Sequence, residues 1–258
     1  MGNIDHCNFD NVTLDLRNAI LFNDNGTITN CQFTNFLLSA SELEGPNITS
    51  GFVAIKGSGT IINSTFSRME TYCSNVEGFI LHFGGDSVVR DCTFSNYGVS
   101  KWRDNQIFRG TIYGAAALEI SNCTMKDATI TSSTCLEINL LIQAVDVTIT
   151  DSTFSNIYVF PWIRTVNASA SLIHFHSGSI DGCTFEYINE TVQKQMPEIE
   201  GTKFATVSST GNSNKQLHFY QHPLSGSEQS NTRRDPGYPI WFSHKLLFQQ
   251  LFGFFHHE

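Results

Sequence analysis

Carboxylate and imidazole side chains are the first residues of this chain to consider for chemistry. Asp86 and Asp146 stand at equivalent places in two similar stretches, and His82 lies four residues before Asp86. Two carboxyl groups on either side of a glycosidic bond can act as acid and as base or nucleophile in its cleavage. Asp86, Asp146 and His82 are therefore the candidate catalytic residues of a polysaccharide hydrolase or lyase.

A short phrase that recurs seven times must position these residues. Copies of it begin about every 30 residues, and such a period indicates one structural unit stacked on itself. The copies are IDHCNFDN from Ile4, ITNCQFTN from Ile28, IINSTFSR from Ile61, VRDCTFSN from Val89, ISNCTMKD from Ile120, ITDSTFSN from Ile149 and IDGCTFEY from Ile180.

We number each copy from its Cys or Ser, which is position zero. Ile or Val stands at position minus three and Phe or Met at plus two, and these residue types suit strands. Positions zero and plus two share one face of a strand. The predicted interior ladder consists of Ile28, Cys31, Phe33, Ile61, Phe66, Val89, Cys92, Phe94, Ile120, Cys123, Ile149, Phe154, Ile180, Cys183 and Phe185.

Other columns predict bends and further interior positions. Position minus one is Asn, Asp or Gly in six copies, types that tolerate the left-handed backbone of a sharp bend. The Asn at plus four predict a fourth column, whose stacked amides can hydrogen bond from coil to coil at a bend and which could also lie inside. Nine residues before zero, Phe22, Ile55 and Phe83 give way to other types in later copies, which indicates either a polar, tapering interior or a shift of register. The later residues are Gly114, Gln143 and His174.

Stacking of these units defines the expected fold. A strand–bend–strand unit cannot bury its own apolar face, whereas coils stacked about 4.8 Å apart can. The sequence therefore predicts an all-β chain, a parallel β-helix of about seven coils over residues 1–190.

The phrase I-x-N-C-x-F-x-N resembles the repeat of right-handed parallel β-helix proteins with the pectin-lyase-like fold. It is particularly similar to the FxxN-type repeats of polymorphic outer membrane proteins and their protist look-alikes, over residues 1 to about 190. The resemblance implies a right-handed β-helix, surface display and adhesion. Neither the autotransporter barrel of the bacterial members nor their GGA[ILV] motif is present, and Gly114-Ala115-Ala116 is the nearest approach to the motif.

Many β-helix proteins cleave acidic glycans, which makes a pectin-lyase-like lyase or hydrolase the alternative function. The chain has no adjacent Asp pair, Arg-x-Lys or Asn-Thr-Asp of the kind that polygalacturonases and pectate lyases show. Asp86 and Asp146 fall two coils apart, about 10 Å along the axis, near the upper end of the inverting-enzyme range. The sequence favours solvent-facing polar residues and a protein that is not an enzyme.

Five of the seven Cys stand at position zero, as small buried residues. Free thiols are the main interpretation, because Ser fills the same column in two copies. Disulfides Cys7–Cys31 and Cys92–Cys123 are the alternative, although Cβ atoms about 4.8 Å apart exceed the usual separation of about 3.8 Å. No Cys-x-x-Cys occurs, so we expect no metal and no cofactor.

Charge and segment composition limit the partners and the location. The net charge of −9 argues against nucleic acid, and no run of 18 apolar residues predicts a transmembrane helix. Seven Asn-x-Ser/Thr sequons favour a secreted or cell-surface glycoprotein whose signal peptide is missing from this chain. Because Asn11 falls in the column that could also lie inside, the predicted acceptors are Asn25, Asn47, Asn63, Asn122, Asn167 and Asn189.

The phrase stops after about residue 190. Residues 191–236 predict a polar linker or irregular segment, with Gly and Pro but no clear period. Residues 237–258 are rich in aromatic residues, and part of this tail fits one helical face. It is interpreted as a helical cap for the last coil, with membrane-surface contact or a disordered tail as alternatives.

The main functional hypothesis is a non-catalytic surface or secreted β-helix that binds glycans or surface proteins. Its contacts are expected along its long side and in the variable loops, and a purely structural spacer is a third reading. The apolar contact patch predicted in the loops comprises Phe36, Leu37, Leu38, Tyr97, Trp102 and Phe108.

Overall fold

The structure of this chain is a computed structural model. It divides into two units, Met1–His222 and Pro223–Glu258, and all of the described residues lie in the first. The expected cap at 237–258 therefore lies outside the described residues. The structure describes residues 1–14, 18–40, 51–73, 80–101, 107–108, 111–133, 137–163, 169–190, 193–194, 203–209 and 213–220.

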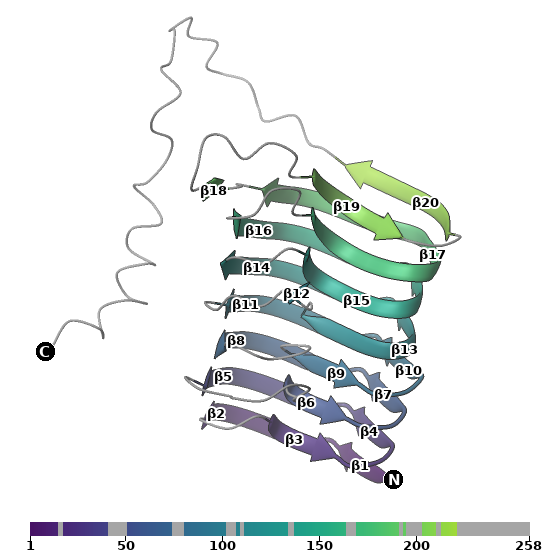
Figure 1. The fold of residues 1–258 in the computed structure, drawn as a ribbon. Helices are drawn as coiled ribbons and strands as arrows, with labels where there is room; N and C mark the ends of the chain where they lie inside the picture. Colours follow the sequence, from purple (N-terminus) through teal and green to yellow (C-terminus); the bar gives the residue numbers. More distant parts are fainter. Residues whose placement is uncertain are drawn as a thin grey trace, which may run out of the picture. The chain divides into compact units, whose positions relative to one another are not determined.

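Almost all of the described residues are in strands, and every strand pairing is parallel (Figure 1). The strands are β1 (Gly2–Asp5), β2 (Asn8–Leu14), β3 (Asn18–Phe22), β4 (Gly26–Thr29), β5 (Gln32–Ala40), β6 (Gly51–Ile55), β7 (Gly59–Ile62), β8 (Thr65–Cys73), β9 (Leu81–Phe83), β10 (Ser87–Arg90), β11 (Thr93–Lys101), β12 (Ile107–Phe108), β13 (Ile112–Ser121), β14 (Thr124–Ser133), β15 (Glu137–Thr150), β16 (Thr153–Ile163), β17 (Ser169–Glu190), β18 (Gln193–Lys194), β19 (Lys203–Ser209) and β20 (Ser213–Tyr220).

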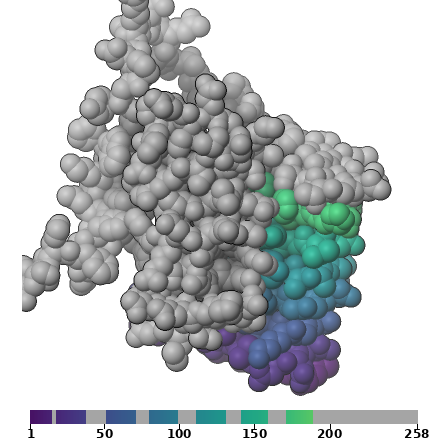
Figure 2. Space-filling view, in the orientation of Figure 1, coloured from purple at the N-terminus to yellow at the C-terminus, as the bar shows by residue number. Residues whose placement is uncertain are grey.

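Successive copies of the phrase occupy successive coils. The minus-three residues pair in order from Ile4 in β1 through Ile28 and Ile61 to Ile180 in β17. The plus-two residues form a second stack, and the segments before each phrase form a third. Figure 2 shows the coils following one another in sequence order. The predicted all-β parallel solenoid, a right-handed β-helix, is confirmed.

Parallel pairing continues beyond the boundary expected at residue 190. Strand β19 pairs with the first part of β17, and β20 pairs with its second part. Phe219 stands in register with Phe185, so a weak form of the phrase reaches into the segment predicted as linker. The sequence KQLHF keeps an apolar residue at zero and plus two but lacks the Ile and Asn that mark the other copies.

The interior is a set of ladders. All fifteen residues expected there are buried. The plus-two rings stack face to face, with centroids 4.8 Å apart for Phe33 and Phe66 and 4.9 Å apart for Phe66 and Phe94. Because offset or parallel ring contacts add to the burial of apolar area, this column favours the in-register arrangement.

Each coil turns at two single residues with left-handed backbone. Position minus one has positive φ in all seven copies, from His6 to Gly182, and so does position plus four. The Asn at plus four lie on a bend, as predicted, and do not take the interior place that was also considered for their column. They form a second column of bends because Asn tolerates this conformation. The plus-four residues are Asn11, Asn35, Arg68, Asn96, Asp127, Asn156 and Tyr187.

A register shift explains the change of residue type nine positions before zero. A bulge between Gly114 and Ala117 places Gly114 opposite Ala144, which in turn faces Phe175. His174 is therefore not the interior residue of its coil, and Phe175 takes that place with no exposed surface. Of the two alternatives, a shifted register is the one observed.

Candidate functional site

Asp86 lies in the bend between β9 and β10 and is exposed to solvent. Its Oδ1 atom accepts a hydrogen bond of 3.2 Å from the backbone N–H of Ala117, in the next coil. Ala117 ends the bulge of β13, where the strand ladder is interrupted. The Asp86 carboxylate thus accepts a backbone N–H directly beside the bulge.

Asp146 occupies the same column two coils away. It is also exposed, and it stands in register with Ala117 on one side and Ser177 on the other. One complete coil thus separates the two carboxylates, a distance of about 10 Å along the axis. Asp86 and Asp146 do occupy equivalent positions, as predicted from the sequence, but the equivalent residue of the coil between them is Ala117.

His82 lies in β9, between Ala54 of β6 and Tyr113 of β13. Its side chain is buried, and its ring centroid is 5.2 Å from that of Tyr113. It belongs to the stack of strands that precedes the bend containing Asp86. The imidazole is therefore packed within the solenoid wall, against the ring of Tyr113.

The three catalytic candidates do not form one acid–base site. Among the described residues, the ion pairs join His6 to Asp5 and Arg90 to Asp91, so no basic side chain pairs with Asp86 or Asp146 there. The same part of the chain contains no group of three or more metal-ligating side chains. Hydrolysis by paired carboxylates needs both groups at one sugar, with perturbed acidity in at least one.

Polar chemistry is instead concentrated at position zero. The backbone N–H of Cys31 donates to Ser64 Oγ at 3.1 Å, and that of Cys123 donates to Ser152 Oγ at 3.1 Å. Cys7 N–H reaches Cys31 Sγ in the same way, at 3.4 Å. The same contact is made from Ser64 to Cys92, from Cys92 to Cys123 and from Ser152 to Cys183.

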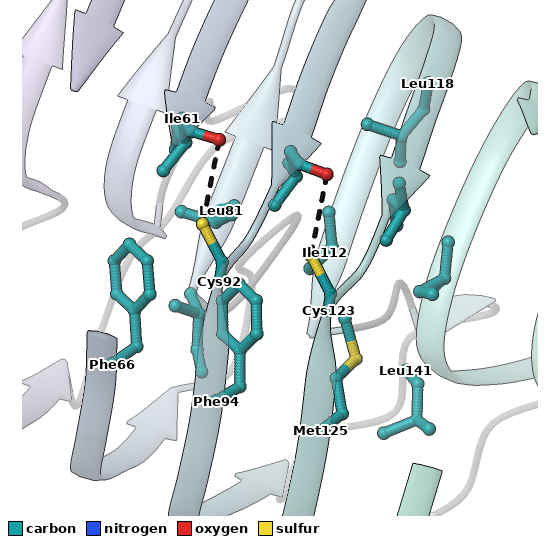
Figure 3. Close-up of a cluster of buried hydrophobic side chains, with 14 of the residues drawn as sticks. Ile61, Phe66, Leu81, Cys92, Phe94, Ile112, Leu118, Cys123, Met125 and Leu141 are labelled. Atoms are coloured by element: carbon teal, nitrogen blue, oxygen red, sulfur yellow. Dashed lines mark hydrogen bonds between the residues drawn. The ribbon is translucent and has the colours of Figure 1, made fainter. Parts of the chain in front are cut away.

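These side chains also return a hydrogen bond to the backbone. Cys92 Sγ–H approaches the carbonyl oxygen of Arg90 at 3.2 Å and that of Ile61, in the previous coil, at 3.6 Å. Figure 3 shows the second contact and its equivalent from Cys123. Ser152 donates to Thr150 at 2.8 Å. Position zero thus requires a small side chain that both donates and accepts, which Cys and Ser satisfy and Ala does not.

The bends carry a second polar column. Asn63 Nδ2 donates to Asn30 Oδ1 at 2.7 Å, and Asn30 Nδ2 donates to Asp5 Oδ1 at 2.9 Å. Asn122 Nδ2 donates to Asp91 Oδ1 at 2.6 Å. In each pair the amide of one coil donates to an oxygen of the preceding coil, so the runs end on a carboxylate, the strongest acceptor available.

Asp5 shows the effect of such a run on acidity. Hydrogen bonds from Thr29, Asn30 and His6 lower the pKa of Asp5 to about 2, because they favour the ionised carboxylate. The aligned amides and hydroxyls of neighbouring coils thus act together on one charged group.

The predicted glycosylation sites differ in their surroundings. Asn25, Asn63 and Asn122 are exposed, and the last two lie on bends, but their amides already bond to the neighbouring coil. Asn11, for which an interior place was also considered, is exposed on a bend. The side chains of the other three predicted acceptors are outside the described residues: Asn47, Asn167 and Asn189.

The sheet between the two bends carries a row of hydroxyl groups that the sequence reading overlooked. Position plus one is Thr in five consecutive coils, each in register with the next and partly exposed. Ser or Thr at plus three adds a second, shorter row, in which Ser95 is buried. The plus-one residues are Thr65, Thr93, Thr124, Thr153 and Thr184. Alignment of the copies could have revealed this face, since the Thr column is as regular as the Phe column.

The apolar patch predicted in the loops is wrong for two of its members. Phe36 and Tyr97 are buried, and both belong to the interior column that follows the plus-four bend. Phe36 packs edge-on against Phe33 and Phe52. Leu37 is partly exposed. The other members have side chains outside the described residues: Leu38, Trp102 and Phe108.

Comparison of the chain with known protein families, curated protein sequences and solved structures finds no match in any of the three. Within the described residues, no helix has the length and apolar character needed to cross a membrane.

Proposed function

We propose that this protein is a non-catalytic binding protein of the cell surface or the secreted space, which holds a glycan along its long side. The observation that carries the proposal is the five-coil row of Thr at position plus one, beside the shorter Ser/Thr row at plus three. A hydroxyl group both donates and accepts hydrogen bonds, as the hydroxyl groups of a sugar do.

The geometry of this face suits an extended polymer. Its rows repeat about every 4.8 Å along the axis, and a strand places its two outward rows two residues apart. Bends on both sides carry exposed Asn and Asp, which add further donors and acceptors. A linear glycan lying along the axis meets an equivalent set of groups at each coil, so many weak contacts add up.

The arrangement of the acidic residues favours binding over cleavage. Asp86 caps a bulge, Asp146 lies one full coil beyond it, and His82 is buried in another stack. Membership of the pectin-lyase-like group, with an adhesive role like that of polymorphic outer membrane proteins, is part of the proposal. It is supported by the coil geometry and the repeated phrase.

A combined binding and cleavage assay tests the proposal. The protein is mixed with pectins, alginates and glycosaminoglycans, and bound protein, new reducing ends and unsaturated products are measured together. We expect binding to at least one polymer without cleavage. The variant with Thr93→Val, Thr124→Val and Thr153→Val should lose on the order of tenfold or more in affinity, since it removes three hydroxyl groups but keeps strand-favouring residues.

A matched variant on the neighbouring sheet is the control. Thr27, Thr60 and Thr148 stand in one outward column four residues before zero, where another coil already carries Val88. Changing these three to Val should leave affinity unaltered. Cleavage of a polymer by the parent protein would instead support the lyase or hydrolase alternative. An equal loss of affinity in both variants would show that the plus-one Thr row is not the binding face.

A further inference from the structure

Two pairs of thiols lie in neighbouring coils without a Ser between them, Cys7 with Cys31 and Cys92 with Cys123. In each pair the thiols donate to backbone carbonyl oxygens, as Cys31 does to Thr29 at 3.1 Å and Cys92 to Arg90 at 3.2 Å. All four are free in the structure. Main-chain contacts hold the first pair in register, because Gln32 N–H donates to the Cys7 carbonyl at 2.9 Å and Cys7 N–H approaches Cys31 Sγ at 3.4 Å.

The spacing of such a pair is close to that of a disulfide. In-register residues of parallel strands have Cα atoms about 4.8 Å apart, inside the 4.4–6.8 Å range that disulfides span. Their Cβ atoms are too far apart by less than about 1 Å. A bond therefore forms only where one coil can move slightly toward the other.

The two pairs differ in their exposure to solvent. Cys7 lies between β1 and β2, and its side chain is partly exposed. Cys92 and Cys123 are buried in coils that are paired on both sides. A dissolved oxidant therefore reaches Cys7 more readily than Cys92 or Cys123.

We propose that Cys7 and Cys31 form a reversible disulfide that links the first two copies of the phrase, while Cys92 and Cys123 stay reduced. With glutathione disulfide as oxidant, the Cys7 thiolate attacks one glutathione sulfur and releases one glutathione thiolate. The Cys31 thiolate then attacks the Cys7 sulfur of the mixed disulfide and releases the second. Two protein thiols are oxidised and one glutathione disulfide is reduced to two glutathione molecules.

The bond is readily reduced because the coil spacing strains it. Its formation also removes the Cys31 thiol proton, which points to the Thr29 carbonyl at 3.1 Å, so oxidation carries a local cost in hydrogen bonding. Both effects make the cross-link responsive to the redox state of its surroundings. This inference is independent of glycan binding.

Peptide mapping of the full chain after equilibration in glutathione buffers of increasing oxidised fraction tests the proposal. Free thiols are blocked with N-ethylmaleimide before digestion. We expect the peptides of Cys7 and Cys31 to be joined, with the loss of two hydrogen atoms, at an oxidant ratio on the order of tenfold lower than any joining of Cys92 to Cys123. Dithiothreitol should restore both thiols in the folded protein.

Serine variants give the matched control, since Ser is native to this column. Cys31→Ser should stop at a mixed disulfide between Cys7 and glutathione, whereas Cys123→Ser should leave the first cross-link unchanged. The proposal is overturned by equal or earlier joining of Cys92 to Cys123, by bonding of Cys7 to another Cys, or by a Cys7 thiol that stays fully alkylatable across the series.

Discussion

Gly114 lies against Leu118, so closely that a methyl group on Gly114 would come within 3.3 Å of the Leu118 Cβ atom. In the first coil the sizes are reversed, because Phe22 packs over Gly26. The two columns run through the whole solenoid in register, and a large residue in one accompanies a small residue in the other. The pairs are Phe22/Gly26, Ile55/Gly59, Phe83/Ser87, Gly114/Leu118, Ala144/Val147 and Phe175/Gly178.

This exchange of volume predicts strong coupling between the two positions. Gly114→Phe alone should destabilise the protein by about 1–3 kcal/mol through overpacking, and Leu118→Gly alone by about 2–5 kcal/mol through the cavity it leaves. The double variant restores the arrangement of the first coil. It should recover about 1–3 kcal/mol as a coupling energy in a urea-unfolding double-mutant cycle. Additive losses would show that the size exchange is incidental.

The hydrogen bonds at position zero predict which residues the column accepts. Ser152→Ala leaves the Cys123 N–H buried without its acceptor, so we expect a loss of about 1–3 kcal/mol in the free energy of unfolding. Ser152→Cys provides a sulfur acceptor, as Cys31 does for Cys7, and should lose less than half as much. Urea denaturation of both variants measures this difference. Equal stability of the two would show that position zero contributes through packing alone and not through its hydrogen bonds.

Arg68 predicts a stabilising substitution. It holds a left-handed φ of 52° in the plus-four column, where its neighbours in the preceding and following coils are Asn35 and Asn96. Arg68→Asn should raise the free energy of unfolding by about 0.5–1 kcal/mol, because Asn adopts this conformation more easily and can join the amide column. Arg90→Asn, on extended backbone, is the control and should give no gain. A neutral result at Arg68 would mean that its side chain offsets the strain by contacts of its own.

The fold could be predicted from the sequence because the same residue types return at the same spacing. In a ladder the same contact between neighbouring coils is repeated at every coil. Ile, Cys and Phe at fixed positions therefore stack on their equivalents in only one register. The bend at minus one followed from its Asn and Asp for the same reason. At plus four the bend was predicted too, but an interior place stayed open, because stacked amides are compatible with both an interior column and a corner.

The candidate site could be predicted only in part. Asp86 and Asp146 do share a column, but no sequence pattern indicates that the Asp86 carboxylate accepts the N–H of Ala117, beside the bulge after Gly114. The bulge shifts the register between β13 and β15 by one residue, and an alignment of the copies without gaps cannot show such a shift. Burial of Phe36 and Tyr97 was missed because a coil continues inward after its second bend, where a loop was expected.

Asp5 predicts an acid-sensitive contribution to stability. Its folded pKa of about 2 lies below the ordinary value of 3.8, so its contribution is complete above pH 3.8 and is lost as the pH falls through 2. Asp5→Asn removes the charge that Thr29, Asn30 and His6 stabilise. The difference in thermal midpoint between parent and variant should therefore be constant near pH 6 and disappear toward pH 2. A difference that does not change with pH would assign the effect to packing.

The direction of the amide runs gives a last prediction, at Asn122. Its Nδ2 donates to Asp91, so Asn122→Asp removes the donor and places two carboxylates in neighbouring coils. We expect a loss of about 1–2 kcal/mol at pH 7, which should shrink below about pH 4, where a protonated carboxyl group can again donate. Adding Asp91→Asn reverses the pair, amide for carboxylate, and should recover at least half of the loss at pH 7. Since both types keep the left-handed bend, recovery isolates the hydrogen bond from the conformation, and its absence would show that the order of Asn and Asp along the bends has no energetic role.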